Sequence, residues 1–163
     1  MLGQQVSLGS ARAALARLEA TAGELTPTAV AALGEAGLRT AGLTRQKAGY
    51  LADLAGVVLD GRLDLEALDH APDDEVIATL VALRGIGRWT ADIYLLMGLG
   101  RPDVWPGGDL ALIIAAREAL SLGPDASGIA IAQLADGWRP WRSTAARMLW
   151  QDYLLRRGRQ LDE

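Results

Sequence analysis

Residues 83–91 read L-R-G-I-G-R-W-T-A, and this stretch decides the fold that we expect. Apolar residues run up to its glycines on one side and leave them on the other, which indicates two helices joined by a short turn. Gly85 and Gly87 flank Ile86 in a turn expected to be too tight for side chains, because glycine tolerates positive φ and lets another backbone approach closely. The free amides of the helix that begins near Arg88 form an anion site suited to a phosphate. The stretch therefore predicts a helix–hairpin–helix that binds the DNA backbone.

A carboxylate follows this hairpin along the chain. Eighteen residues after Ala91, Asp109 stands at the start of a new apolar helix in V-W-P-G-G-D-L-A-L. An aspartate in this position is a good helix N-cap. A carboxylate that follows a DNA-binding hairpin also suggests chemistry on DNA, and the two roles are compatible.

The composition excludes several classes of protein. The chain has 163 residues, half of them hydrophobic, and contains no apolar run near the roughly 20 residues that cross a membrane. It has no cysteine, which excludes disulfides, thiolate metal sites and iron–sulfur clusters, and its one histidine, His70, cannot build a zinc site unaided. Met1 is not followed by the basic segment of a signal peptide. We therefore expect a soluble, cytoplasmic protein that needs no transition metal. A monomer is our separate expectation, which the sequence does not fix.

The formal net charge of −4 conflicts at first sight with DNA binding, because phosphate contacts usually come with a basic surface. Between Trp138 and Gln160, however, the chain has six arginines and a single acid, Asp152. This segment predicts one positive face on an acidic body, and a solvated charged tail is the alternative. The six are Arg139, Arg142, Arg147, Arg156, Arg157 and Arg159.

Helical periodicity runs through almost the whole chain, and no alternating strand pattern of useful length is present. Later helices are expected over residues 109–120, 129–135 and 143–157. Trp138 and Trp141 are assigned to the core. The sequence thus predicts an all-α fold with short loops. Residues typical of helix starts are Ser10, Thr26 with Pro27, Thr44 and Pro72.

Five motifs stand in order along the chain: L-G-Q-Q-V-S (2–7), G-L-T-R-Q-K-A (42–48), L-R-G-I-G-R-W-T-A (83–91), the P-x-G-D-L-A-L element ending at Leu112, and W-R-P-W-R-S (138–143). Together they resemble the helix–hairpin–helix (HhH-GPD) DNA glycosylase superfamily, most closely its 3-methyladenine DNA glycosylase II, or alkylbase glycosylase, branch. The resemblance implies one catalytic domain over residues 1–163, built as a two-lobed helical core with the active site in the cleft between the lobes. The lobes would comprise residues 20–106, and residues 1–19 together with 107–163.

The resemblance implies a DNA glycosylase of base excision repair, which flips an alkylated base of the 3-methyladenine or 7-methylguanine type from the duplex and hydrolyses its N-glycosidic bond. Asp109 matches the family's essential aspartate, which stabilises the oxocarbenium-like sugar and orients or deprotonates the attacking water. Trp89 stands where members that also cut the strand have a Schiff-base lysine, which implies a monofunctional enzyme. Lys47, the only lysine, is expected to decorate a helix start, or at best to touch a phosphate.

Four further positions match the family's substrate pocket. Trp89 and Trp150 match aromatic residues that stack on a positively charged alkylated base, and ordinary core packing is the alternative. Gln4 and Gln5 fall where the family pushes a side chain into the gap left by the flipped base. The chain has Ile93 where the family pocket often has a tyrosine, which leaves the base preference open.

The resemblance also implies how the hairpin contacts double-stranded DNA. The phosphate just beyond the lesion would be bound by Gly85, Ile86, Gly87, Arg88 and Thr90. In similar hairpins backbone carbonyls hold a monovalent cation, Na⁺ or K⁺, and no other cofactor is required. Here these carbonyls would belong to Val81, Leu83 and Ile86.

Family members have one or more helices before the first motif, whereas this sequence starts at the motif itself, so we expect that an N-terminal segment is lacking. Two hypotheses remain open. The first is a monofunctional alkylbase glycosylase, which Asp109 and the aromatic residues favour. The second is a catalytically weak or inactive helix–hairpin–helix DNA-binding module, which the missing segment and the acidic composition favour.

Overall fold

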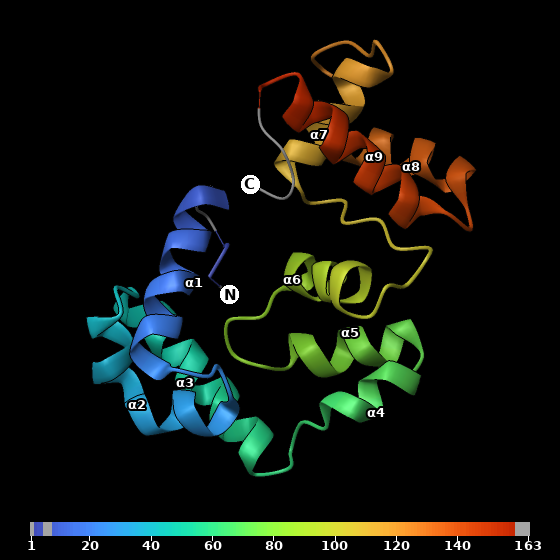
Figure 1. Cartoon of the computed structure of the whole chain (residues 1–163). Coiled ribbons are helices and arrows are strands. Elements are labelled where there is room, and N and C mark those ends of the chain that lie inside the picture. Colours follow the sequence, from blue (N-terminus) through green and yellow to red (C-terminus); the bar gives the residue numbers. More distant parts are fainter. Residues whose placement is uncertain (1, 5–7, 159–163) are drawn as a thin grey trace. The chain divides into compact units, whose positions relative to one another are not determined.

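The computed structural model describes residues 2–4 and 8–158, and these residues form helices and turns without a β-strand (Figure 1). The predicted all-α class is therefore confirmed. No helix in this described part is both long and apolar enough to cross a membrane. The helices are α1 (Leu8–Ala22), α2 (Pro27–Thr40), α3 (Arg45–Leu59), α4 (Leu65–His70), α5 (Asp73–Val81), α6 (Arg88–Ile93), the π-helix η1 (Tyr94–Gly98), α7 (Leu110–Ala119), α8 (Gly128–Ala135), the 3₁₀-helix η2 (Asp136–Trp138) and α9 (Arg142–Leu155).

The chain divides into two compact units, Met1–Gly87 and Arg88–Glu163. In the first unit, Leu18 of α1 packs in one buried cluster with apolar residues of α2 and α3. The lobes expected from the resemblance, residues 20–106 and residues 1–19 together with 107–163, stay predictions. The single catalytic domain and the cleft between lobes stay predictions.

In the first unit, threonine side chains begin α2 and α3, as the sequence predicts. Thr26 and Thr44 each accept a hydrogen bond from the backbone N–H three residues later, at 3.1 and 3.2 Å. The Ser10 cap is wrong, because α1 already begins at Leu8 and a residue inside the first turn does not take the extended N-cap conformation. The short helix α4 was not predicted, because six residues span fewer than two turns of the periodic pattern.

Helices α7 and α9 pack together in the second unit (Figure 1). Leu112 and Ala116 of α7 are buried, and so are Ala146 and Trp150 of α9. This packing brings Trp150, in the second half of α9, to the start of α7. The N-terminus of α7 is where Asp109 stands.

The chain between α6 and α7 contains the π-helix η1, which the periodicity did not predict. The backbone N–H of Leu99 donates to the carbonyl of Tyr94, five residues earlier, at 3.0 Å. Arg147 of α9 donates to the carbonyl of Leu96 at 2.7 Å and so ties η1 to α9. Turns of this type are rare and frequently occur at functional sites.

The two tryptophans assigned to the core differ in their surroundings. Trp138 is half-buried and packs edge-to-face on Trp105, with ring centroids 5.5 Å apart. The core assignment of Trp141 is wrong, because its residue surface is 63% exposed. Trp141 immediately precedes α9, and its backbone N–H closes a turn on the carbonyl of Trp138 at 2.8 Å, while the side chain stays in solvent.

Candidate active site

Asp109 occupies the N-cap of α7, as its place in the sequence indicates. Its backbone is extended, and Oδ1 accepts a hydrogen bond from the backbone N–H of Leu112 at 2.7 Å. The backbone N–H of Asp109 in turn donates to the carbonyl of Pro106 at 3.0 Å, which closes the turn before the helix. The carboxylate therefore lies at the positive end of the helix dipole.

Two indole groups hold the same carboxylate. Trp89 Nε1 donates to Oδ2 of Asp109 at 2.9 Å, and Trp150 Nε1 donates to Oδ1 at 3.2 Å. Trp150 is buried, whereas Trp89 and Asp109 are half-buried. Among the described residues, 2–4 and 8–158, no lysine or arginine forms an ion pair with Asp109. The carboxylate is thus fixed by neutral donors, and its negative charge is available to stabilise a cation that develops nearby.

The structure brings Trp89, Trp150 and Asp109 together through these two hydrogen bonds, and their roles in catalysis and in a base pocket stay predictions. The indole N–H bonds to the carboxylate, however, were not predicted. The sequence holds a signal for these hydrogen bonds, because both positions carry tryptophan. The indole N–H of tryptophan can only donate a hydrogen bond, and a carboxylate can accept it. The chain has five tryptophans and no phenylalanine. Stacking of either ring on a base stays a prediction.

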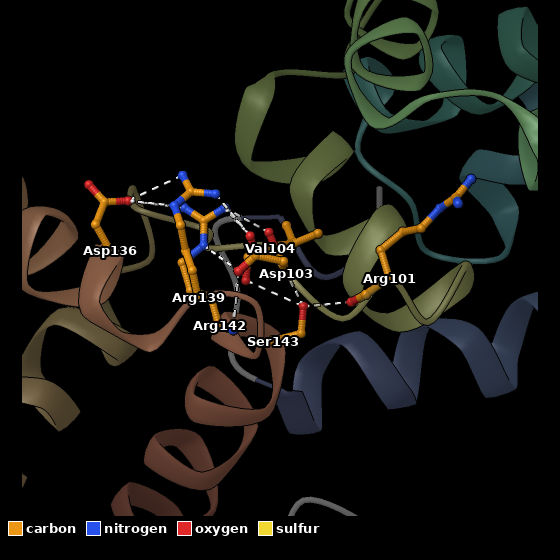
Figure 2. Close-up of polar contacts among 7 residues, drawn as sticks. All are labelled: Arg101, Asp103, Val104, Asp136, Arg139, Arg142 and Ser143. Atoms are coloured by element: carbon orange, nitrogen blue, oxygen red, sulfur yellow. Dashed lines mark hydrogen bonds and ion pairs between the residues drawn. The ribbon is translucent and has the colours of Figure 1, made fainter.

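The segment leading to Asp109 is anchored by the W-R-P-W-R-S motif (Figure 2). The buried Ser143 hydroxyl donates to the carbonyl of Arg101 at 2.6 Å and accepts from the backbone N–H of Val104 at 2.9 Å. Arg142 binds Asp103 through two nitrogens, Nε to Oδ1 at 2.7 Å and Nη2 to Oδ2 at 3.0 Å. These hydrogen bonds hold the pKa of Asp103 below its ordinary value. The motif therefore fixes the backbone of residues 101–104, just upstream of the catalytic candidate.

The arginines predicted to form a positive face are paired within the protein. Arg139 and Arg142 share Asp103 and Asp136 (Figure 2). Arg156 pairs with Asp152 at 2.7 Å, Arg157 pairs with Glu118 at 2.7 Å, and Arg147 binds the Leu96 carbonyl. Arg159 lies outside the described residues. Three of the acids that pair with these arginines, Asp103, Glu118 and Asp136, come from other segments and so do not show within residues 138–160.

The glycines of the hairpin differ in what they require. Gly85 has φ +83°, and a Cβ added to it would lie 2.3 Å from Cδ2 of Tyr50, so this position accepts only glycine. A Cβ on Gly87 would meet nothing within 4 Å, so the tight packing expected around this glycine is not observed. The backbone N–H of Ile86 donates to the carbonyl of Leu83 at 3.1 Å and closes the turn. The loop from Ala82 to Gly87 thus joins α5 to the first residue of α6.

Two predicted DNA-binding residues lie on α6. Arg88 donates through Nε to Oδ1 of Asp92, one turn later, at 2.8 Å, and its side chain is 69% exposed. Asp92 is buried, and this burial raises the pKa of its carboxyl group despite the arginine. Thr90 is half-buried. The buried Asp92 was missed by sequence analysis. The contacts of the hairpin with DNA stay predictions.

Gln4 lies against the hairpin loop of its own unit. Its Nε2 donates to the carbonyl of Gly85 at 3.0 Å. Gln5 lies outside the described residues. Lys47 is half-buried at the start of α3, where its ammonium group donates to the carbonyls of Leu2 and Gln4, two contacts that were not predicted. A contact of Lys47 with a phosphate stays a prediction.

Comparison with known proteins identifies the family of this chain. The family model described as "HhH-GPD superfamily base excision DNA repair protein" matches residues 1–140. DNA-3-methyladenine glycosylase 2 of Escherichia coli is 31% identical over 161 residues, covering 92% of this chain and 54% of that relative. A DNA-3-methyladenine glycosidase structure from Bacillus halodurans has a TM-score of 0.79 at 31% identity, covering 93% of this chain and 71% of the other. The Schizosaccharomyces pombe 3-methyladenine DNA glycosylase Mag1, in complex with abasic DNA, has a TM-score of 0.85 at 26% identity, covering 92% and 75%.

The chain spans about half the length of the curated relatives that it matches. The family model nevertheless covers most of this chain, and the similarity to solved structures extends over nearly all of it. The five motifs and the carboxylate at the start of α7 lie in the order that the resemblance implied. The chain belongs to the HhH-GPD superfamily of base excision DNA repair proteins.

Proposed function

We propose that this chain is the catalytic part of a monofunctional DNA glycosylase that hydrolyses the N-glycosidic bond of alkylated bases of the 3-methyladenine and 7-methylguanine type. The observation that carries the proposal is the carboxylate of Asp109, held by Trp89, Trp150 and the N-terminus of α7. The names of relatives, which refer to 3-methyladenine, support the substrate class. The proposed partner is double-stranded DNA with an alkylated base, bound by a monomer in the cytoplasm.

In the proposed reaction, the bond between C1′ of the sugar and the base breaks, and its electron pair leaves with the base. An alkylated purine of this type carries a positive charge, so it departs as a neutral molecule without a proton from the protein. The sugar becomes oxocarbenium-like, and the carboxylate of Asp109 stabilises this cation. Water then adds to C1′ and gives its proton to Asp109, which leaves an abasic sugar and a free base.

Trp89 and Trp150 have two roles in this proposal. Their N–H groups fix both oxygens of the Asp109 carboxylate, so the carboxylate does not reorient as the cation forms. Their electron-rich faces attract a cationic base, an effect of about 1–2 kcal/mol. A neutral base gains less from such stacking, which favours alkylated over normal bases.

The proposal that the enzyme lacks lyase activity rests on Trp89, which stands in the hairpin where strand-cutting members have a lysine. Trp89 has no amine with which to form a Schiff base. The chain's only lysine, Lys47, binds two backbone carbonyls with its amine, at 2.8 and 2.9 Å. The expected product is therefore an intact strand with an abasic site. Borohydride treatment during turnover should trap no covalent complex, and a trapped lysine adduct would overturn this part of the proposal.

A monovalent cation at the hairpin is also proposed, held by the carbonyls of Val81, Leu83 and Ile86. The Leu83 carbonyl accepts one hydrogen bond, from Ile86, and a carbonyl oxygen has a second lone pair with which to bind an ion. When bound, Na⁺ or K⁺ would supply positive charge beside the DNA phosphate. Backbone amides of the loop would supply the direct contacts.

The decisive experiment compares the full chain with Asp109→Asn on methylated duplex DNA, with released bases measured by chromatography. The rate of base release should fall sharply in the variant, because several kcal/mol of transition-state stabilisation are lost. The variant should still bind a duplex with an abasic-site analogue. Asp125→Asn, at an exposed position of the same unit, is the control and should retain activity. Near-normal release by Asp109→Asn would refute the catalytic role. DNA binding by the wild type without any base release would instead support the DNA-binding module.

A further inference from the structure

Lys47 binds the backbone of a segment far from it in sequence. It lies in the first turn of α3, and its ammonium group donates to the carbonyls of Leu2 and Gln4 at 2.8 and 2.9 Å. Both contacts are partly buried. A charged donor makes a stronger hydrogen bond than a neutral one, so Lys47 fixes the backbone of residues 2–4 on α3.

The side chain of Gln4 continues this connection to the hairpin loop. Its Nε2 donates to the carbonyl of Gly85 at 3.0 Å, across 81 positions of sequence. Lys47 therefore holds the backbone of Gln4, and the side chain of Gln4 holds Gly85. Two successive hydrogen-bond steps join α3 to the loop, all within the first unit.

Helix α3 also contacts the loop directly. The ring of Tyr50 lies where a Cβ of Gly85 would be, and the guanidinium carbon of Arg84 lies 5.3 Å from the centroid of that ring. Arg84 also pairs with Asp53 at 3.0 Å. Tyr50 is three residues from both Lys47 and Asp53, so it is a neighbour of each on the helix surface. Helix α3 therefore contacts two successive loop residues, Arg84 and Gly85, directly. Lys47 adds an indirect contact with Gly85 through Gln4.

We infer that Lys47 is a positioning residue for DNA binding, which acts through Gln4 to hold the hairpin loop in its binding conformation. The inference rests on the proposed function, since it requires this loop to bind the DNA backbone. A loop that is already ordered loses less conformational entropy on binding. Lys47 orders the loop by donating hydrogen bonds from its ammonium group to protein carbonyls. The loop, and not Lys47, binds the DNA phosphate.

The first test measures the affinity of the full chain for a duplex with an abasic-site analogue, over a series of potassium chloride concentrations. Lys47→Met should weaken binding about tenfold, which is the scale of one hydrogen bond from a charged group. The salt slope, meaning the slope of the logarithm of the binding constant against the logarithm of potassium chloride concentration, should stay unchanged. If Lys47 contacted a phosphate itself, the slope would fall by about one, which would overturn the inference. Arg45→Met, an exposed cation on the same helix, is the matched control for the stability and secondary structure of α3.

The second test asks whether Lys47 acts through Gln4. Gln4→Ala should weaken binding by a similar factor, and the double variant should be no weaker than either single one. Lys47→Arg should restore most of the affinity, because a guanidinium also donates to two carbonyls. Independent, additive losses in the double variant would overturn the proposed connection.

The third test needs no DNA and so separates this inference from the proposed function. Hydrogen exchange of the amides at residues 84–87 should be faster in Lys47→Met and in Gln4→Ala than in the wild type, and unchanged in Arg45→Met. Circular dichroism should show that the helices are retained. Unchanged exchange in Lys47→Met would overturn the inference whatever the DNA result. A wild type that binds no duplex would refute the proposed function, while the exchange data would still decide whether Lys47 holds the loop.

Discussion

The indole N–H of Trp89 donates to Oδ2 of Asp109 at 2.9 Å, which joins the second helix of the hairpin to the first residue before α7. Trp150 binds the other oxygen from α9, so three helices of one unit converge on one carboxylate. Neither donor carries a formal charge. The arrangement orients the carboxylate and leaves its charge unneutralised, which is the property that stabilisation of a sugar cation requires.

Trp89→Phe and Trp150→Phe test this orientation, because phenylalanine keeps an aromatic ring and removes the N–H donor. Each should lower the rate of base release by about tenfold to a hundredfold, the scale of one hydrogen bond to a charged group. Single-turnover release from methylated DNA is the measurement. Trp141→Phe, at an exposed position of the same unit, should behave as the wild type. Equal rates in all three variants would show that the indole N–H groups do not contribute.

Gly85→Ala and Gly87→Leu should separate stability from DNA binding. Gly85→Ala should lower the free energy of unfolding by about 2 kcal/mol or more, because φ is +83° and the added Cβ meets the Tyr50 ring. Gly87→Leu should leave the urea midpoint nearly unchanged, because space is open there, and should weaken DNA binding by blocking backbone approach. Unchanged DNA affinity in Gly87→Leu would argue against the hairpin as the phosphate site.

Ser143→Ala should destabilise the second unit by about 1–3 kcal/mol, because the backbone N–H of Val104 loses its acceptor in a buried place. Urea denaturation measures this loss. Base release should also fall, since the anchored segment leads to Asp109. Thr144→Ala, the next residue and exposed, is the control. A stable and fully active Ser143→Ala would show that the anchor is dispensable.

Asp103→Asn and Asp92→Asn should change stability in opposite directions. The pKa of Asp103 is lowered in the folded state, so its ionised form contributes stability above the ordinary carboxyl pKa, and this contribution is lost as pH falls through the lowered pKa. Asp103→Asn should therefore be less stable near neutral pH, with the difference vanishing in acid. The pKa of Asp92 is raised by burial, so the wild type loses stability as pH rises through that pKa.

Asp92→Asn should accordingly be more stable than the wild type near neutral pH, and similar to it in acid. The measurement is urea denaturation of the wild type and both variants from about pH 2 to about pH 7, a series that extends well below the ordinary carboxyl pKa of about 4, where the Asp103 contribution is lost. If both variants lost stability equally at every pH, the assigned pKa directions would be wrong.

DNA affinity should depend only weakly on salt. The described arginines of residues 138–158 bind acceptors within the protein, and loop amides carry no formal charge. The logarithm of the binding constant should fall with the logarithm of potassium chloride concentration with a slope of about −3 or shallower. Arg157→Ala, which removes a cation paired with Glu118, should leave that slope unchanged. A slope twice as steep would indicate that these arginines leave their partners to bind phosphate.

Local features of this protein could be read from the sequence because each depends on residues a few positions apart. The threonine caps of α2 and α3, the positive φ of Gly85 and the N-cap role of Asp109 are of this kind. The order of the five motifs along the chain was enough to predict the family. The helical period gave the all-α class. It did not give the π-helix η1, because a single widened turn leaves the apolar pattern almost unchanged.

Tertiary structure decided which distant groups meet. Trp150 and Asp109 are 41 positions apart and Gln4 and Gly85 are 81 apart, and no local pattern states that their polar atoms come within hydrogen-bond distance. The same holds for Lys47, expected at a helix start or on a phosphate and bound in the structure to Leu2 and Gln4. It also holds for Arg142 and Arg157, whose acids come from other segments. The physical reason is that burial of apolar faces sets helix packing, and packing then determines which donor reaches which acceptor.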